Sequence, residues 1–250
     1  MRFSSPLIRG TLIRRYQRFL ADVRLEDGRT ITAVCPNTGS MKTCIVPGNP
    51  VLLSESDSPT RKYRHTWEMI RIGRSWVGIN TANPNAVVHE AIVGGRVPEL
   101  AGYEEARREV RFGREGSRVD ILLRKKGDHL CYVEVKNVTL HAGDGFAAFP
   151  DSVSERGAKH LRELAAMVKE GHRAVMFFFL GRSDCDRVRP ADEIDPDYGT
   201  ELRRAAKAGV EMLAYRALIR SDRITLGRAV PFEIPEGFPP AGPGGRRRGR

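Results

Sequence analysis

This chain of 250 residues carries 42 Lys and Arg against 31 Asp and Glu, a formal net charge of +11, and is long enough for one large domain or two modest ones. Its four scattered cysteines include no C-x-x-C pair, so the sequence suggests neither a zinc site nor a disulfide framework and favours reduced thiols. No apolar signal segment opens the chain and no run approaches the roughly 20 apolar residues of a membrane span, so we expect a soluble, cytoplasmic protein.

Residues 1–79 are expected to form an OB-like β-barrel domain. Short strand-like runs, separated by turn signals, extend from LIRGTLIRRYQRFLADVRL through RTITAVCP and NPVLLSES to TWEMIRIGRSWVGIN. No helical period interrupts these runs, and a small barrel is the economical way to pair them. The segment holds 13 Lys and Arg against 6 Asp and Glu, a charge that suits a phosphate backbone.

A cluster of arginines and aromatic side chains lies in the first of these runs. Arg14, Arg15 and Arg18 surround Tyr16, and Phe19 follows them. Single-strand-binding proteins combine cations and stacking surfaces in this way, so the three arginines and Tyr16 are candidate nucleic-acid contacts. The alternative is a barrel whose aromatic side chains belong to the core and whose arginines are merely solvated.

The hexapeptide PNTGSM, residues 36–41, is a turn-rich loop. Pro36 fixes one backbone angle, and Gly39 permits another. Polar groups along such a loop can donate to a phosphate, so Asn37, Thr38 and the following Lys42 are further candidate nucleic-acid contacts. An ordinary tight loop is the alternative.

Residues 80–235 change to alternating helices and strands, which predicts a mixed sheet packed with helices. NPNAVVHEAIVGG predicts a helix capped by Asn83 or Asn85 and stopped by Gly94 or Gly95. The apolar run AVMFFFL is typical of a strand covered on both faces. Strands are expected near residues 107–112, 118–124, 131–138 and 174–180, and over VEMLAYRA.

Two further helices are expected in this half. DSVSERGAKHLRELAAMVKEGH predicts an amphipathic helix that opens with a Ser152-x-x-Glu155 capping box. Its Arg156, Lys159 and His160 are candidate phosphate contacts, with a charged outer face as the alternative. The second helix is expected near residues 197–208, and a helix-turn-helix over TELRRAAKAGVEMLAYRALI is the other interpretation of that region. Residues 236–250 are expected to be a disordered basic tail.

The strands around VDILLRKKGDHLCYVEVKN carry a constellation of two carboxylates and a lysine. Alternate residues of a strand share a face, so Glu134 and Lys136 point the same way. A three-residue turn at 126–128 sets Asp120 opposite Glu134, whereas a two-residue turn would send Asp120 to the other face. Two facing, buried carboxylates require a cation. Magnesium fits, because it takes one or two carboxylates and keeps several waters, and Mn²⁺ is the other candidate.

Two roles follow for this constellation, catalysis and metal binding. Asp120, Glu134 and Lys136 are the candidate catalytic residues, with Lys136 orienting water or stabilising charge on a phosphate. Asp120 and Glu134 are the candidate metal ligands, and Glu90 on the upstream helix would add a third oxygen. The alternative is an exposed hairpin on which Glu134 and Lys136 make a weak surface contact.

Five segments, in order along residues 1–232, resemble the sugar fermentation stimulation protein A (SfsA) family: YQRFLADV, CPNTGSM, RVDILL, YVEVKNVTL and FPDSVSERGAKHLREL. The resemblance implies an N-terminal OB-like domain joined to a C-terminal domain of the PD-(D/E)XK nuclease type, with DNA binding as its role. Asp120 would match the first acid of that motif, Glu134 and Lys136 its E-x-K, and Glu90 its helix acid. Val119 stands where the motif has proline.

The resemblance leaves more than one function open. The first is a DNA-binding protein with a Mg²⁺-dependent phosphodiesterase site, an endonuclease or exonuclease. The second is a non-catalytic DNA-binding transcriptional regulator of sugar metabolism, of the maltose type. RNA is not excluded as the partner, because OB surfaces also bind RNA, and a homodimer stays open as the assembly.

Overall fold

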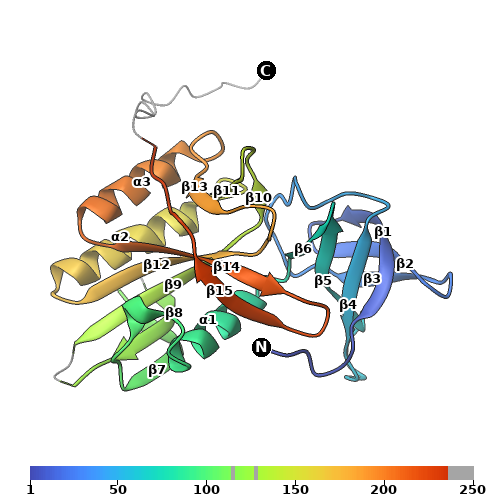
Figure 1. The fold of residues 1–250 in the computed structure, drawn as a ribbon, viewed down its shortest axis with the longest axis horizontal. Coiled ribbons are helices and arrows are strands. Elements are labelled where there is room, and N and C mark those ends of the chain that lie inside the picture. Colours follow the sequence, from blue (N-terminus) through green and yellow to red (C-terminus); the bar gives the residue numbers. More distant parts are fainter. Residues whose placement is uncertain (114–115, 127–128, 236–250) are drawn as a thin grey trace.

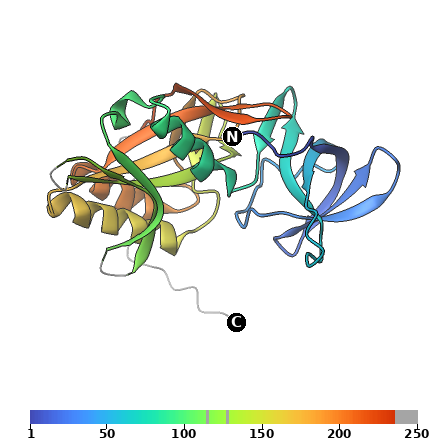
Figure 2. The same cartoon turned by 90° about the horizontal axis from the view of Figure 1, so that it is seen from below.

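Two bodies lie side by side in the computed structural model, which describes residues 1–113, 116–126 and 129–235 (Figures 1 and 2). The first is a β-barrel, drawn blue to teal, and the second is a layered α/β body, drawn green to red. The predicted basic tail, residues 236–250, lies outside the described residues.

The barrel has the predicted OB-like topology. Its strands pair in the order β3-β2-β1-β4-β5-β6, with antiparallel neighbours throughout. A parallel pairing of Ala33 with His65 and of Val34 with Thr66 joins β3 to β5, so β1 to β5 form a closed five-stranded barrel. The strands are β1 (Ile8–Tyr16), β2 (Leu20–Leu25), β3 (Thr30–Val34), β4 (Pro50–Glu55), β5 (His65–Ile72) and β6 (Ser75–Gly78).

The second body is built on a six-stranded mixed sheet of order β15-β14-β12-β9-β8-β7. The central strand β12 runs parallel to β9 and β14, and the other pairings are antiparallel. Its strands are β7 (Glu105–Phe112), β8 (Ser117–Arg124), β9 (Leu130–Val138), β12 (Arg173–Leu180), β14 (Glu211–Ile219) and β15 (Ile224–Ala229). A small second sheet joins β10 (Leu140–His141), β11 (Phe146–Phe149) and β13 (Arg187–Pro190).

Helices cover both faces of the six-stranded sheet (Figure 1). Val175 and Phe177 of β12 pack in one apolar cluster with α1 (Asn83–Val93), and the alternate Met176 and Phe178 pack in another with α2 (Glu155–Lys169) and α3 (Pro196–Lys207). This confirms the prediction of a strand covered on both faces. The segment VEMLAYRA is a strand, β14, so the helix-turn-helix interpretation is wrong.

The predicted N-cap residues of α1 and α2 are wrong, whereas the predicted C-terminal end of α1 is confirmed. The residue before α1 is Ala82, which makes no side-chain cap bond, and the amide of Asn83 donates to Glu68 Oε2 at 2.8 Å instead. The Oγ of Ser154, not of Ser152, accepts the backbone N–H of Gly157 and caps α2. Helix α1 ends at Gly94 and Gly95, as the sequence predicts, and Gly95 has a φ of +68°.

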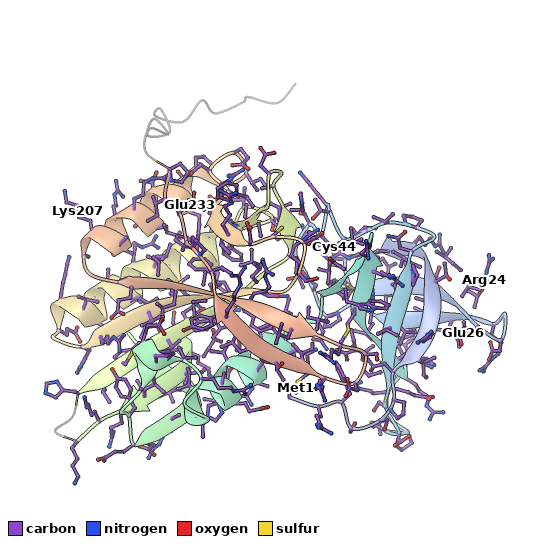
Figure 3. The ribbon with its side chains drawn as sticks, viewed as in Figure 1. Met1, Arg24, Glu26, Cys44, Lys207 and Glu233 are labelled. Atoms are coloured by element: carbon purple, nitrogen blue, oxygen red, sulfur yellow. The ribbon has the colours of Figure 1, made fainter. Side chains whose placement is uncertain are left out.

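The two bodies share apolar and polar contacts that fix their placement. Leu52 and Met69 of the barrel belong to the same buried cluster as Val88 and Phe177 of the second body. The N–H of Gly78 donates to the carbonyl of Gly181 at 2.9 Å. The amino group of Met1 donates to the carbonyl of Ile224 at 3.0 Å, so Met1 lies against β15 of the second body (Figure 3).

All four cysteines are free and buried. None of the helices in the described residues has the length and hydrophobicity that a membrane crossing requires.

Candidate active site

The carboxylates of Asp120 and Glu134 come from neighbouring strands in the predicted register. Ile121 pairs with Val133 and Arg124 pairs with Leu130 in the antiparallel ladder of β8 and β9. The same register places Asp120 opposite Glu134. Residues 127 and 128 of the predicted three-residue turn lie outside the described residues, but the N–H of Lys125 donates to the carbonyl of His129, as that turn requires.

Asp120 is held at both oxygens. Asn85 donates its amide N–H to Oδ1 at 2.6 Å, and the backbone N–H of Val135 donates to Oδ2 at 2.7 Å. Burial, together with the negative charge of Glu134, raises the pKa of the Asp120 carboxyl to about 6. The ionised pair is therefore costly to this fold unless a cation shares the site.

Glu134 is almost fully buried, with 2% of its surface exposed. Its Oε1 accepts from Lys136 Nζ at 2.6 Å and is also bonded to His160 Nδ1, whereas Oε2 is buried without a hydrogen-bond partner in the described residues. Burial opposes ionisation, but the charge of Lys136 and the hydrogen bond from His160 hold the pKa of Glu134 below its ordinary value. Glu134 is thus an ionised carboxylate with one oxygen unused.

His160 orients Glu134 and does not lie on the surface where the sequence placed it. The ring is 3% exposed, and its Nε2 accepts from Arg156 Nε at 3.4 Å, which assigns the ring proton to the Nδ1 that donates to Glu134. Its prediction as a nucleic-acid contact is wrong, because the apolar face of α2 turns it into the protein. Arg156 lines the cavity described below, whereas Lys159 is half-buried and is not among the lining residues.

Glu90 is not part of this site. Its carboxylate forms an ion pair with the terminal amino group of Met1 at 2.5 Å and another with Arg96 at 3.2 Å, and its side chain is 52% exposed. At about 100° of rotation per residue, Glu90 lies roughly 140° around α1 from Asn85, the residue that does reach Asp120. The prediction of Glu90 as a third ligand is therefore wrong, and α1 contributes an amide in its place.

A cavity of about 620 Å³ opens over the two carboxylates, and both bodies line it. The second body provides the floor with Asp120, Glu134 and Lys136. The loop PNTGSM provides a wall from the barrel, as Asn37, Thr38 and Gly39 all line the cavity. The site is therefore formed at the junction of the two bodies, and the OB-like barrel is part of it.

The loop is locked against the second body by Asp151. The backbone N–H of Met41 donates to Asp151 Oδ2 at 2.9 Å, and the hydroxyl of Ser40 donates to the Asp151 carbonyl. From the other side, Arg15 donates to the carbonyls of Asn37 and Gly39, at 2.8 and 3.0 Å. Arg15 therefore supports the loop, and its guanidinium is occupied.

The other predicted contacts of the barrel divide into two groups. Arg14 forms an ion pair with Asp22 at 2.8 Å, and the hydroxyl of Tyr16 donates to the same carboxylate at 3.1 Å. Arg18 is exposed and lines the cavity, whereas Lys42 is exposed outside it. Of the arginine and aromatic cluster, only Arg18 is brought to the site together with the loop.

A substitution at Gly39 tests the locked loop. A Cβ at this position would lie 2.4 Å from Asp151 Oδ1, so we expect Gly39→Ala to displace that carboxylate and to cost about 1 to 2 kcal/mol of unfolding free energy. In a double-mutant cycle measured by urea unfolding, the cost of Gly39→Ala should fall when Asp151 is already alanine. Costs that simply add would contradict this contact.

The donor set fits a hard divalent cation. Asp120 and the unpartnered Oε2 of Glu134 are carboxylate oxygens, the ligand type that Mg²⁺ and Mn²⁺ prefer. No group of three or more His, Cys, Asp or Glu side chains suited to a metal ion occurs in the described residues. The chain would thus supply two carboxylates and leave the other positions to water or substrate.

Comparison with known proteins divides the sequence into the same two bodies. The family model described as "SfsA N-terminal OB domain" matches residues 13–79, and the model described as "Sugar fermentation stimulation protein RE domain" matches residues 82–223. The chain is similar to the sugar fermentation stimulation protein homolog of Citrifermentans bemidjiense, with 57% identity over 92% of this chain and 99% of that protein. The chain is also similar to the sugar fermentation stimulation protein homolog of Thioalkalivibrio sulfidiphilus, with 53% identity over 94% of this chain and 98% of that protein.

A solved structure is also similar over almost the whole length. The structure of Pyrococcus furiosus SfsA in complex with Ca²⁺ matches with a TM-score of 0.84 and 28% sequence identity, covering 94% of this chain and 98% of that one.

Proposed function

Because this chain belongs to the sugar fermentation stimulation protein (SfsA) family, we propose that it is a DNA-binding protein with a phosphodiesterase site that depends on Mg²⁺ or Mn²⁺. One observation carries the proposal: Asp120 and Glu134 face the same cavity, beside Lys136, and one buried oxygen of Glu134 has no hydrogen-bond partner in the described part of the chain. Such a pair is costly to bury for structure alone, which favours a site maintained for chemistry.

The two carboxylates would hold the cation. The Ca²⁺ complex of the similar Pyrococcus furiosus protein supports a divalent ion in this family. When bound, the ion supplies charge for a phosphate oxygen and a more acidic water. Asn85 and the N–H of Val135 hold Asp120 in place, and His160 holds Glu134, so both carboxylates are oriented before any ligand arrives.

Lys136 is the chain's own catalytic cation in this proposal. Its Nζ lies 2.6 Å from Glu134 Oε1 and lines the same cavity. An ammonium group there can stabilise negative charge that develops on a phosphate and can orient an attacking water. Arg18 and Arg156, which line the cavity from the two bodies, would hold neighbouring phosphates of the DNA.

Hydrolysis of DNA in the presence of a divalent ion is the expected result. Purified protein should cleave single-stranded or double-stranded DNA with Mg²⁺ or Mn²⁺, and EDTA should abolish the cleavage because the paired carboxylates need the ion. Gel analysis of both substrates, labelled at one end, separates endonuclease from exonuclease products. Wild-type protein that cleaves neither substrate with either ion would refute the hydrolytic proposal.

A non-catalytic DNA-binding regulator of sugar metabolism is the second candidate function. One observation favours it: helix α1 places the amide of Asn85, and not a carboxylate, against Asp120, which limits the negative charge available to a metal ion. Specific DNA binding without cleavage would then be expected. RNA as the partner, a homodimeric assembly and a cytoplasmic location stay predictions.

A further inference from the structure

A second groove lies on the barrel and shares no lining residue with the active-site cavity. Its volume is about 400 Å³. One residue, Ser221, comes from the hairpin of β14 and β15, and all the others come from the barrel. Its charged lining residues are Arg9, Arg24, Glu26 and Arg71, and its aromatic one is Trp76.

Strand registers place five of the lining residues in one row across the barrel. Thr11 of β1 pairs with Arg24 of β2 on one side and with Pro50 of β4 on the other. Val51 pairs with Ile70, so Pro50 is level with Arg71 of β5, and Arg71 pairs with Trp76 of β6. Directly paired residues project from the same face of a sheet. At about 4.8 Å between strands, this row is roughly 19 Å long.

The row is hollow in the middle and cationic at its sides. Thr11 and Pro50, both exposed and short, form the floor. Arg9, two residues before Thr11, projects from the same face of β1, because side chains alternate along a strand. Figure 3 shows Arg24 and Glu26 on the outer side of the barrel, away from the second body.

The arginines of this groove have no ion-pair partner in the described part of the chain. Arg9, Arg24 and Arg71 are all exposed, and their guanidinium groups make no hydrogen bond or ion pair there. Arg14 and Arg15 differ, because both are occupied by acceptors of the barrel itself. The lining residues hold three arginines against one acid, Glu26, so the groove is complementary to a polyanion.

An aromatic side chain adds a second kind of contact. Trp76 is half-buried at the end of the row nearest the second body, where it packs against the shared apolar cluster and also lines the groove. Positively charged grooves with an aromatic side chain are typical of single-strand-binding surfaces. A guanidinium group presents forked donors that match phosphate oxygens.

We propose that this groove binds the phosphate backbone of a single nucleic-acid strand, with Arg9, Arg24 and Arg71 as the phosphate contacts. The inference goes beyond the proposed hydrolysis, because binding in the groove needs neither the carboxylates nor a metal ion. In this proposal, the main nucleic-acid contacts of the barrel lie in the row across β1, β2, β4 and β5. The sequence instead indicates the segment from Arg14 to Phe19.

The test is the binding of a fluorescein-labelled, mixed-sequence single-stranded oligonucleotide to the full chain in EDTA, followed by fluorescence anisotropy. The triple variant Arg9→Gln/Arg24→Gln/Arg71→Gln is expected to raise the Kd at least about tenfold at low salt. The slope of log affinity against log salt should become shallower by about 2, since each lost single-strand phosphate contact contributes about 0.7.

A matched control removes the same charge elsewhere. Arg108, Arg111 and Arg118 are exposed on β7 and β8 and make no ion pair within the described residues. Their triple change to Gln should leave the Kd within about twofold of wild type. Equal losses in the two triple variants would overturn the proposal, because net charge alone would then explain binding.

A second variant tests the floor of the groove. Thr11→Glu adds a carboxylate at an exposed position without touching the core, and it should weaken binding at least about tenfold, whereas Thr60→Glu, also exposed on the barrel, should not. Thermal unfolding by circular dichroism verifies that each variant is folded. Unchanged single-strand binding in both groove variants overturns the proposal, as does a loss confined to a duplex of the same sequence. Because cleavage is not measured here, inactivity of the hydrolytic site leaves these outcomes unaffected.

Discussion

The substitution Asp120→Asn is expected to lower the rate of metal-dependent DNA hydrolysis by a factor on the order of 10³, which corresponds to about 4 kcal/mol of lost transition-state stabilisation. Asparagine keeps the shape of the side chain and can still accept from Asn85, but it removes the negative charge that faces Glu134. The measurement is the initial rate of cleavage at saturating Mg²⁺, on the DNA substrate that wild type cleaves best.

The control for this substitution is Asp57→Asn, which makes the same chemical change at a fully exposed position of the barrel. It should leave the rate within about twofold of wild type. A wild-type rate in Asp120→Asn, or activity of either protein in EDTA, would contradict the assignment of Asp120 and would indicate a contaminating nuclease.

Asp120→Asn is also expected to make the fold more stable than wild type above about pH 6 when no divalent ion is present, although it lowers the rate of hydrolysis. The pKa of Asp120 is raised from 3.8 to about 6 in the folded chain, first by burial and then by Glu134. When the pKa of a carboxyl is higher in the folded chain than in the unfolded chain, its contribution to stability is fully present at pH values below the unfolded pKa. That contribution is lost as the pH rises through the folded pKa, here about 6. The full difference is about 3 kcal/mol, from about 1.4 kcal/mol per pKa unit.

Urea unfolding in EDTA at pH 5 and pH 8 measures this effect. Wild type should lose about 1.4 kcal/mol relative to Asp120→Asn between these two pH values, because the variant has no proton to release at this position. Addition of Mg²⁺ should then stabilise wild type and not the variant. A gap between the two proteins that is the same at both pH values would show that Asp120 does not carry a raised pKa.

The register of β8 and β9 could be predicted from the sequence because local rules determine it. A short turn between two alternating strands decides which residues share a face, and it placed Asp120 with Glu134. The OB-like barrel followed from the same kind of evidence, short strands with turn signals between them. The run AVMFFFL is apolar at every position, and the structure covers both of its faces.

The errors come from contacts that depend on orientation or on distant segments. The prediction of Glu90 rests on its place at the border of the apolar stripe of its helix, whereas the phase of α1 turns Asn85 to the site. The sequence predicts His160 as a surface cation, but the apolar face of α2 turns it into the protein, where it bonds to Glu134. Asp151 contacts a loop 110 residues earlier in the chain, so no local pattern indicates it.

Anomalous X-ray diffraction from crystals soaked in Mn²⁺ can locate the one divalent ion that Asp120 and Glu134 are proposed to hold. We expect a manganese peak in the active-site cavity, liganded by the Asp120 carboxylate and by Glu134 Oε2, and no such peak in Asp120→Asn. No peak between these two side chains in wild-type crystals, or manganese bound only elsewhere on the chain, would contradict this proposal.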